Sequence, residues 1–118
     1  KIQRGQESPQ DTVVDLVETF HYLIGMHVRR LERYEHQGRA YVVSRGDVRT
    51  ERGIDKVVTI WRDTQGLDLE QEAAWVNAEV LTELVDRVYV NGYENFIEHA
   101  QPTEITFRQL MEAPVYGD

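Results

Sequence analysis

The pattern of hydrophobic positions changes from helical to strand-like near residue 25. Ser8 and Pro9 form a typical helix start, because serine caps a helix and proline suits its first position. Apolar residues then recur every three or four positions as far as Ile24, and Gly25 is the type of residue that follows a helix end. We therefore predict a helix that ends at Ile24. One long helix to Glu35 is the alternative, because apolar residues continue at a similar spacing.

Residues 27–62 show short apolar runs separated by turns. Residues 39–44 and 56–61 are rich in β-branched and aromatic residues, which favour strands. The second of these runs is almost continuously apolar, which indicates a strand buried on both faces. We predict an antiparallel meander across 27–62. Glycine among polar residues indicates turns at 36–38, 45–47 and 51–53.

The second half of the chain predicts a strand, helix and strand in succession. Asp68 is placed to cap a helix whose apolar positions continue through residues 73–85. Residues 87–90 form a short apolar strand, and a helical crossover between neighbouring strands makes them parallel. A last short helix begins near Pro102, and the tail at 113–118 is predicted to be loose.

Together these elements predict an α/β fold in one small domain at residues 8–112. Its mixed sheet combines the antiparallel meander with a parallel strand added through a βαβ crossover, and helices flank the sheet. A length of 118 residues suits a single domain. Because the chain opens with Lys1 rather than methionine, we expect it to be a piece of a longer protein.

Charge is distributed unevenly along the chain. The formal net charge is −8, with a surplus of basic residues over 29–62 and a large surplus of acidic residues over 63–118. The overall sign opposes non-specific binding of nucleic acid, although the basic stretch can touch phosphate locally. We take Arg39, Arg45 and Arg49 as candidate phosphate contacts. The alternative is a solvated, arginine-rich hairpin.

Several classes of chemistry are absent from the sequence. There is no cysteine for a disulfide or thiolate site, and the four histidines lack metal-ligand spacing. Neither a phosphate-binding glycine loop nor a Ser–His–Asp pattern is present. We therefore assign no catalytic, metal-binding or cofactor-binding residue. The longest apolar stretch is too short to span a bilayer and no signal peptide is visible, so we expect a cytoplasmic protein without a membrane partner.

Two polar loops follow predicted strands at one edge of the sheet. Ligands of open α/β sheets bind outside the carboxyl ends of the strands, so these loops are the candidate ligand or interface site. Alternatively, the arginine only pairs with a carboxylate, the tryptophan fills the core, and the Asn-Gly pair is a tight turn. The candidate residues are Trp61, Arg62 and Asp63 after the first strand, and Asn91, Gly92 and Asn95 after the second.

Five sequence blocks are distinctive. They are D-L-V-E-T-F-H-Y-L-I-G at 15–25, G-R-A-Y-V-V at 38–43, V-V-T-I-W-R-D-T-Q-G-L-D at 57–68, V-Y-V-N-G at 88–92 followed by Phe96, Ile97 and Ala100, and F-R-Q-L-M at 107–111. In this order, and over most of residues 13–111, they resemble adenine-specific DNA methyltransferases of the type III restriction–modification (Mod subunit) kind.

In that family this stretch lies at the carboxyl end, after a core with D-P-P-Y and F-x-G-x-G type motifs that do not occur here. The resemblance implies an accessory C-terminal domain that is non-catalytic by itself. The implied parent enzyme transfers a methyl group from S-adenosylmethionine to adenine N6 in DNA, which requires the base to leave the stack. The implied partners are the methyltransferase core of the same polypeptide, a second Mod subunit, a restriction subunit, and DNA as the parent's substrate.

The sequence also departs from the family and leaves other hypotheses open. His21 stands where the family often has Asn, and the loop at 93–95 is one residue longer. A second hypothesis is a free-standing α/β domain that binds a nucleotide or small ligand with the loops after the strands at 56–62 and 87–91. A third is a module that serves only oligomerisation.

Overall fold

A computed structural model describes residues 9–112, and its elements confirm the predicted α/β class. A five-stranded mixed sheet has the order β1-β2-β3-β4-β5. Strands β1 to β3 are antiparallel, whereas β3, β4 and β5 are mutually parallel. The elements in chain order are α1 (Pro9–Ile24), β1 (Met26–His36), β2 (Arg39–Thr50), β3 (Gly53–Arg62), α2 (Leu69–Trp75), the π-helical turn η2 (Val76–Val80), β4 (Arg87–Val90), β5 (Ala100–Pro102) and α3 (Thr103–Met111).

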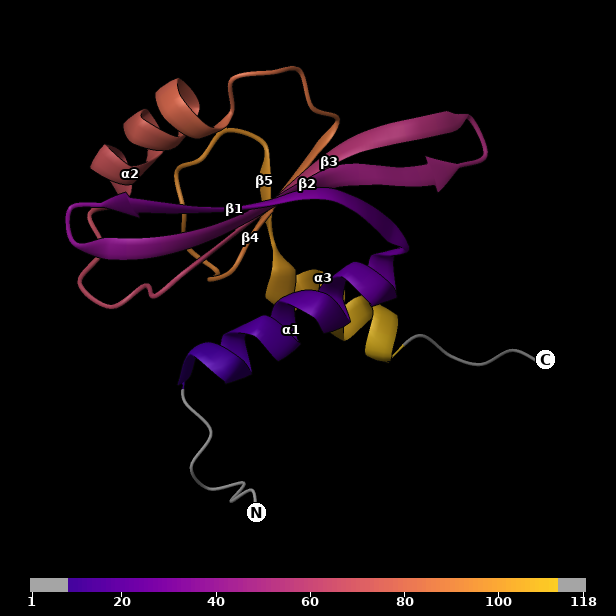
Figure 1. Ribbon diagram of the computed structural model, residues 1–118, viewed down its shortest axis with the longest axis horizontal. Helices are drawn as coiled ribbons and strands as arrows, with labels where there is room; N and C mark the ends of the chain where they lie inside the picture. Colours follow the sequence, from indigo (N-terminus) through magenta and orange to yellow (C-terminus); the bar gives the residue numbers. More distant parts are fainter. Residues whose placement is uncertain (1–8, 113–118) are drawn as a thin grey trace, which may run out of the picture.

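Helices cover the two faces of the sheet. Helices α1 and α3 lie on one face and α2 on the other, while the β2–β3 hairpin extends beyond both layers (Figure 1). On the α1 face, the ring of Phe20 packs edge-on against Trp61, Tyr89 and Phe107, at centroid distances of 5.6, 5.0 and 5.2 Å. On the α2 face, a second cluster joins the inner residues of β2, β3 and β4 to Val76 and Val80, which are fully buried.

The meander and the end of the first helix follow the prediction. Helix α1 ends at Ile24 and β1 starts two residues later, so the alternative of one long helix to Glu35 is wrong. The capping role of Ser8 and the tail at 113–118 fall outside the described residues. In the described part of the chain, no helix has the length and apolar character that a membrane crossing requires.

The predicted turn at 45–47 is wrong, because these residues lie in the middle of β2. Gly46 is a strand residue that lets the backbone of β1 come close to β2. A Cβ atom there would lie 2.1 Å from the carbonyl oxygen of His27, at the point where the β1–β2 register shifts between Val28 and Arg30. A bulge in β1 therefore requires the glycine, and a bulge is a common device for bending an edge strand.

The second helical segment is shorter than the pattern through residues 73–85 predicts. Asp68 caps α2 by accepting hydrogen bonds from two backbone amides, as expected, but helical structure ends at Val80. Leu84 carries the apolar pattern onward and yet is 90% exposed. Beyond the helix, Asp86 exchanges two hydrogen bonds with the backbone of Lys56, which fixes the start of β4 beside β3.

Strand β5 has no counterpart among the predicted elements. It has three residues and ends in proline, which is too short a segment to give a strand signal of its own. Its register with β4 pairs Val88 with Ala100 and Val90 with Pro102. The same proline then precedes α3, so β5 places that helix beside α1.

Candidate functional site

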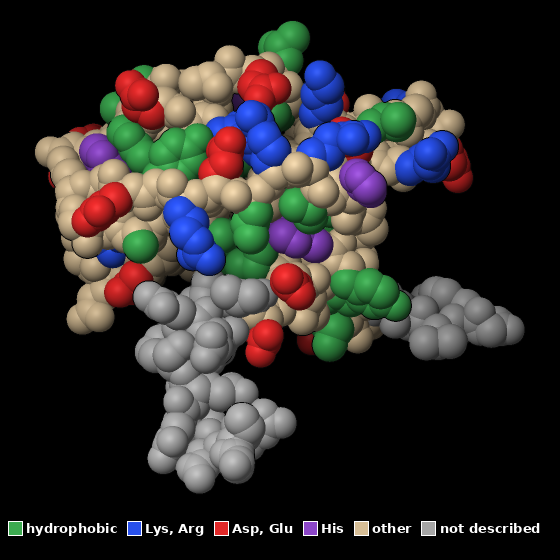
Figure 2. All heavy atoms as spheres, viewed as in Figure 1, with side chains coloured by type: hydrophobic (Ala, Val, Ile, Leu, Met, Phe, Trp, Pro, Cys, Tyr) green, Lys and Arg blue, Asp and Glu red, His purple; other side chains and the backbone are tan. Residues whose placement is uncertain are grey.

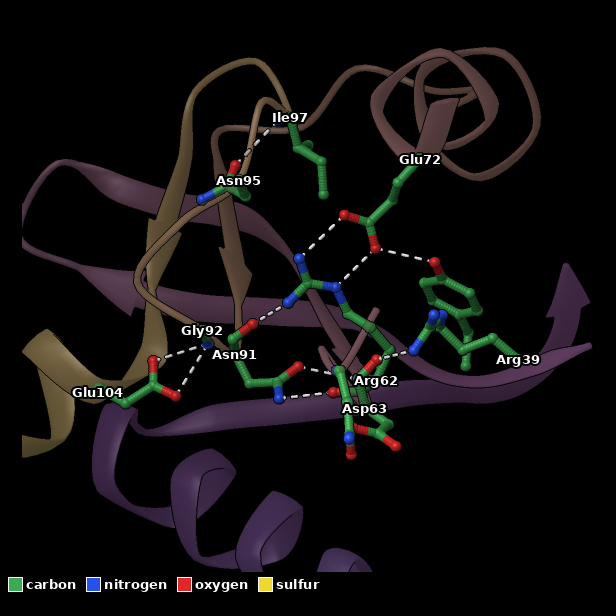
Figure 3. Close-up of polar contacts among 11 residues, drawn as sticks. Arg39, Arg62, Asp63, Glu72, Asn91, Gly92, Asn95, Ile97 and Glu104 are labelled. Atoms are coloured by element: carbon green, nitrogen blue, oxygen red, sulfur yellow. Dashed lines mark hydrogen bonds and ion pairs between the residues drawn. The ribbon is translucent and has the colours of Figure 1, made fainter. Parts of the chain in front are cut away.

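The two candidate loops leave neighbouring parallel strands at the same edge of the sheet, as predicted. Strand β3 ends at Arg62, and β4 ends at Val90. Figure 3 shows that Arg62 and Asn91 point toward one another and that Glu72 reaches Arg62 from α2. The two candidate loops therefore meet through Arg62 and Asn91, whereas Glu72, which lies between α2 and the sheet, was not among the candidates.

Arg62 forms a buried, bidentate ion pair with Glu72. Its Nε atom donates to Oε2 at 2.6 Å and its Nη2 atom donates to Oε1 at 2.9 Å, and both side chains are 0% exposed. The hydroxyl of Tyr41 donates to the same Oε2 atom at 2.8 Å. Burial and this hydrogen bond to Glu72 raise the pKa of Tyr41 far above its ordinary value, so the phenol stays protonated.

Asn91 links the ends of β3 and β4 through a reciprocal pair of hydrogen bonds. Its Oδ1 atom accepts from the backbone amide of Arg62 at 2.8 Å, and its Nδ2 atom donates to the carbonyl of Arg62 at 2.7 Å. The Nη1 atom of Arg62 donates in turn to the Asn91 carbonyl. We call Arg62, Glu72, Tyr41 and Asn91 the strand-end clamp, because their polar groups satisfy one another.

Gly92 continues the clamp toward α3. Both carboxylate oxygens of Glu104 accept from its backbone amide, at 2.9 and 2.8 Å. Its φ of +104° suits glycine, and a Cβ atom there would lie 3.0 Å from Cγ2 of Thr64 and 3.2 Å from Nη1 of Arg62. The Asn-Gly pair therefore forms a tight connection that holds α3 against the sheet.

The remaining strand-end candidates do not join the clamp. The Oδ1 atom of Asp63 accepts from the amide of Gln65 at 3.1 Å, and that of Asn95 accepts from the amide of Ile97 at 2.9 Å, so each closes its own loop. Trp61 is buried in the cluster on the α1 face, on the opposite side of the sheet from Glu72. The consecutive residues Trp61, Arg62 and Asp63 thus serve three different parts of the fold: the core on the α1 face, the clamp and the loop.

A shallow hollow of about 320 Å³ lies between the two loops. Of the six strand-end candidates, only Gly92 lines it. Its other lining residues are Thr64, Leu67, Leu69, Tyr93 and Glu94, none of them cationic. The hollow therefore lacks the positive groups that recognition of a phosphate requires.

The three arginines proposed as phosphate contacts lie in different environments. Arg45 is buried and donates to Glu32 at 2.8 Å and to the carbonyl of Val80 at 2.7 Å. Arg39 donates to the carbonyl of Asp63. Arg49 is exposed, and within the described part of the chain its guanidinium has neither an ion pair nor a hydrogen bond. Of the three, Arg49 is the one that presents its charge freely to solvent.

A chain of buried polar groups on the α1 face was also absent from the sequence-based candidates. Nε2 of His21 lies 2.8 Å from Oγ of Ser44, which contacts Oγ1 of Thr59, and Thr59 accepts from Nε1 of Trp61 at 2.8 Å. Burial lowers the pKa of His21, while nearby Glu18 acts in the opposite direction. Ser44 and Thr59 are fully buried, so this chain ties α1 to the sheet and exposes no nucleophile.

The sequence contains only a partial signal for the side chains that pair with Arg62 in the strand-end clamp. Glu72 carries no signal beyond its place in the first turn of α2, where acidic residues are favoured anyway.

Among the described residues, no group of three or more potential ligands is placed to hold a metal ion. Comparison with protein-family models, with curated proteins and with solved structures gives no match for this chain.

Proposed function

We propose that this chain is the C-terminal accessory domain of a site-specific DNA adenine-N6 methyltransferase of a type III-like restriction–modification system. By itself the domain is non-catalytic. Its roles are to pack against the methyltransferase core of the same polypeptide and to support contact with a second Mod subunit or a restriction subunit. S-adenosylmethionine and DNA belong to the parent enzyme, and its location is cytoplasmic.

The strand-end clamp is the observation that carries this proposal. The two most distinctive blocks of the resemblance, at 57–68 and 88–92, meet in space, and Arg62 and Asn91 hydrogen-bond to each other. Their polar groups bond to one another inside the fold, and this arrangement supports a scaffold role for both residues. A motif that builds a scaffold suits a domain whose function is to position something else.

Exposed apolar side chains provide a surface for the packing role. Tyr22 on α1 is 84% exposed and Met111 on α3 is 69% exposed, while Leu16 and Leu110 on the same two helices are each exposed by more than two-fifths. Helices α1 and α3 contact each other on one face of the sheet (Figure 1). Large exposed apolar side chains on adjacent elements are typical of a surface that another protein segment covers.

Reading the coding sequence upstream of Lys1 tests the proposal. We expect one open reading frame in which a D-P-P-Y type motif and a glycine-rich cofactor loop precede this chain. A start codon directly before Lys1, or an upstream region without those motifs, would refute it.

The hollow between the loops favours one second candidate, a free-standing domain that binds a small ligand, although its lack of cationic side chains disfavours the phosphates of a nucleotide. The hollow lies where such ligands bind in open α/β sheets, at the carboxyl ends of the strands. A thermal-shift screen of this chain against nucleotides and S-adenosylmethionine distinguishes the two candidates. A rise in melting temperature supports the second, and a flat screen supports the accessory domain.

A further inference from the structure

A charged pocket of about 250 Å³ lies on the α2 face, away from the strand-end clamp. It lies over the cross-strand rows in which Arg30 faces Arg45 and Asp47 faces Lys56, and residues 83–85 close its side. Six charged residues line it, the basic Arg29, Arg30, Arg45 and Lys56 and the acidic Asp47 and Glu83. The lining residues alone carry a surplus of two positive charges, and Glu32, which pairs with Arg45 at 2.8 Å and lies 3.7 Å from Arg30, reduces it to one, in a chain with a net charge of −8.

One ion pair at the pocket is exposed on both sides and therefore easy to exchange. Arg30 and Glu83 are joined at 2.9 Å, but their side chains are 56% and 52% exposed. In the second pair Arg29 is 62% exposed, whereas Asp47 is 19% exposed. Exposed pairs of this kind contribute little to stability, so an incoming anion can replace a carboxylate at small cost. Figure 2 shows Lys and Arg side chains gathered over the β2–β3 end of the sheet, with acidic side chains among them.

Two cationic groups at the pocket lack a full set of partners. The Arg45 side chain is 9% exposed, and its Nη1 atom is buried without an acceptor in the described part of the chain. A buried donor without an acceptor is rare because its desolvation is not compensated, and an anion that accepts from it lowers that free-energy cost. The Lys56 side chain is exposed and forms no ion pair with any described residue. Its ammonium group is therefore available at the pocket rim.

We propose that this pocket binds a phosphate group, with Arg45 in its wall, Lys56 at its rim, and Arg30 exchanging Glu83 for a phosphate oxygen. Guanidinium groups match the geometry of phosphate oxygens, and several of them on one side of a sheet form an anion site. The phosphate comes from a nucleic-acid backbone or from free phosphate, and the chemistry is the same for both. The inference does not rest on the methyltransferase proposal, because the charges of the pocket are independent of any parent enzyme.

Nuclear magnetic resonance of the full 118-residue chain tests the pocket with two probes, inorganic phosphate and a short DNA duplex, at constant ionic strength. Lys56→Gln removes the available ammonium from an exposed position. Arg52→Gln is the matched control, because it removes one positive charge from the exposed β2–β3 turn, four residues before Lys56 and outside the pocket lining. Arg30→Gln removes a second positive charge from the pocket and gives an independent test of phosphate binding. Superimposable spectra away from the pocket verify that each variant is folded.

We expect at least one probe to shift the backbone amides of Asp47, Lys56 and Val85. Lys56→Gln should weaken that binding about tenfold, the effect of losing one charge-assisted hydrogen bond, and Arg52→Gln should leave it unchanged. Saturable shifts with inorganic phosphate identify free phosphate as a ligand of the pocket. Shifts with DNA alone identify the phosphates of the nucleic-acid backbone as the ligand. The proposal is overturned if neither probe shifts these amides, or if Lys56→Gln and Arg52→Gln weaken binding equally.

Discussion

Replacing Glu72 by glutamine should destabilise the domain strongly, because it leaves the Arg62 guanidinium as a buried charge without a counterion. Both side chains are 0% exposed, and Glu72 accepts hydrogen bonds from Arg62 and Tyr41. Breaking a buried ion pair by removing one partner costs about 3–5 kcal/mol. Glutamine keeps the size and one acceptor oxygen, so we expect about 3 kcal/mol, a large share of the roughly 5–15 kcal/mol typical of a domain.

Urea unfolding followed by tryptophan fluorescence and circular dichroism measures this loss. Glu70→Gln is the matched control on the same helix, because Glu70 is exposed and its change should stay within about 0.5 kcal/mol. The double variant Arg62→Met/Glu72→Met should recover most of the stability lost by either single variant, since a buried pair replaced by apolar residues is often neutral. A loss in Glu72→Gln no larger than that in Glu70→Gln would refute the clamp as a stabilising unit.

Three further predictions concern other parts of the fold. Because burial lowers the pKa of His21 below its ordinary 6.5, the unfolded chain binds more protons, and stability should fall as pH falls through 6.5 toward the folded pKa. His21→Asn should remove that part of the pH dependence of the urea midpoint, and an unchanged profile would contradict it. Gly92→Ala should cost about 1–3 kcal/mol because of its φ of +104°, seen as a lower melting temperature. Gly46→Ala should lower the melting temperature further, because a Cβ atom there lies 2.1 Å from a backbone oxygen; an unaltered melting temperature would mean that the bulge in β1 is absent.

Hydrophobic periodicity predicts the fold well where it is long and regular. The antiparallel meander follows from it, whereas the end of α1 follows from Gly25 and the parallel pairing of β3 with β4 follows from the helical crossover. Periodicity fails where tertiary contacts override local pattern. Gly46 looks like a turn residue but serves close strand approach, and Leu84 extends a helical spacing after the chain has turned toward β4.

The candidate site is predictable in position but not in its chemistry. Strand order brings Arg62 and Asn91 to one edge, and sequence reasoning places them there. Their partners come from elements that pack over that edge, and neither Glu72 nor Tyr41 carries a local signal of its own. The alternatives that Arg62 pairs with a carboxylate and that Trp61 fills the core agree with the structure.

Methyl transfer from radiolabelled S-adenosylmethionine to DNA tests the central claim most directly. The assay compares the full translated product of the gene with the 118-residue chain alone. We predict that the full product labels adenine at N6 and that the chain alone transfers nothing. A full product that labels no DNA, or a chain that transfers methyl groups by itself, would contradict the assignment of a non-catalytic accessory domain.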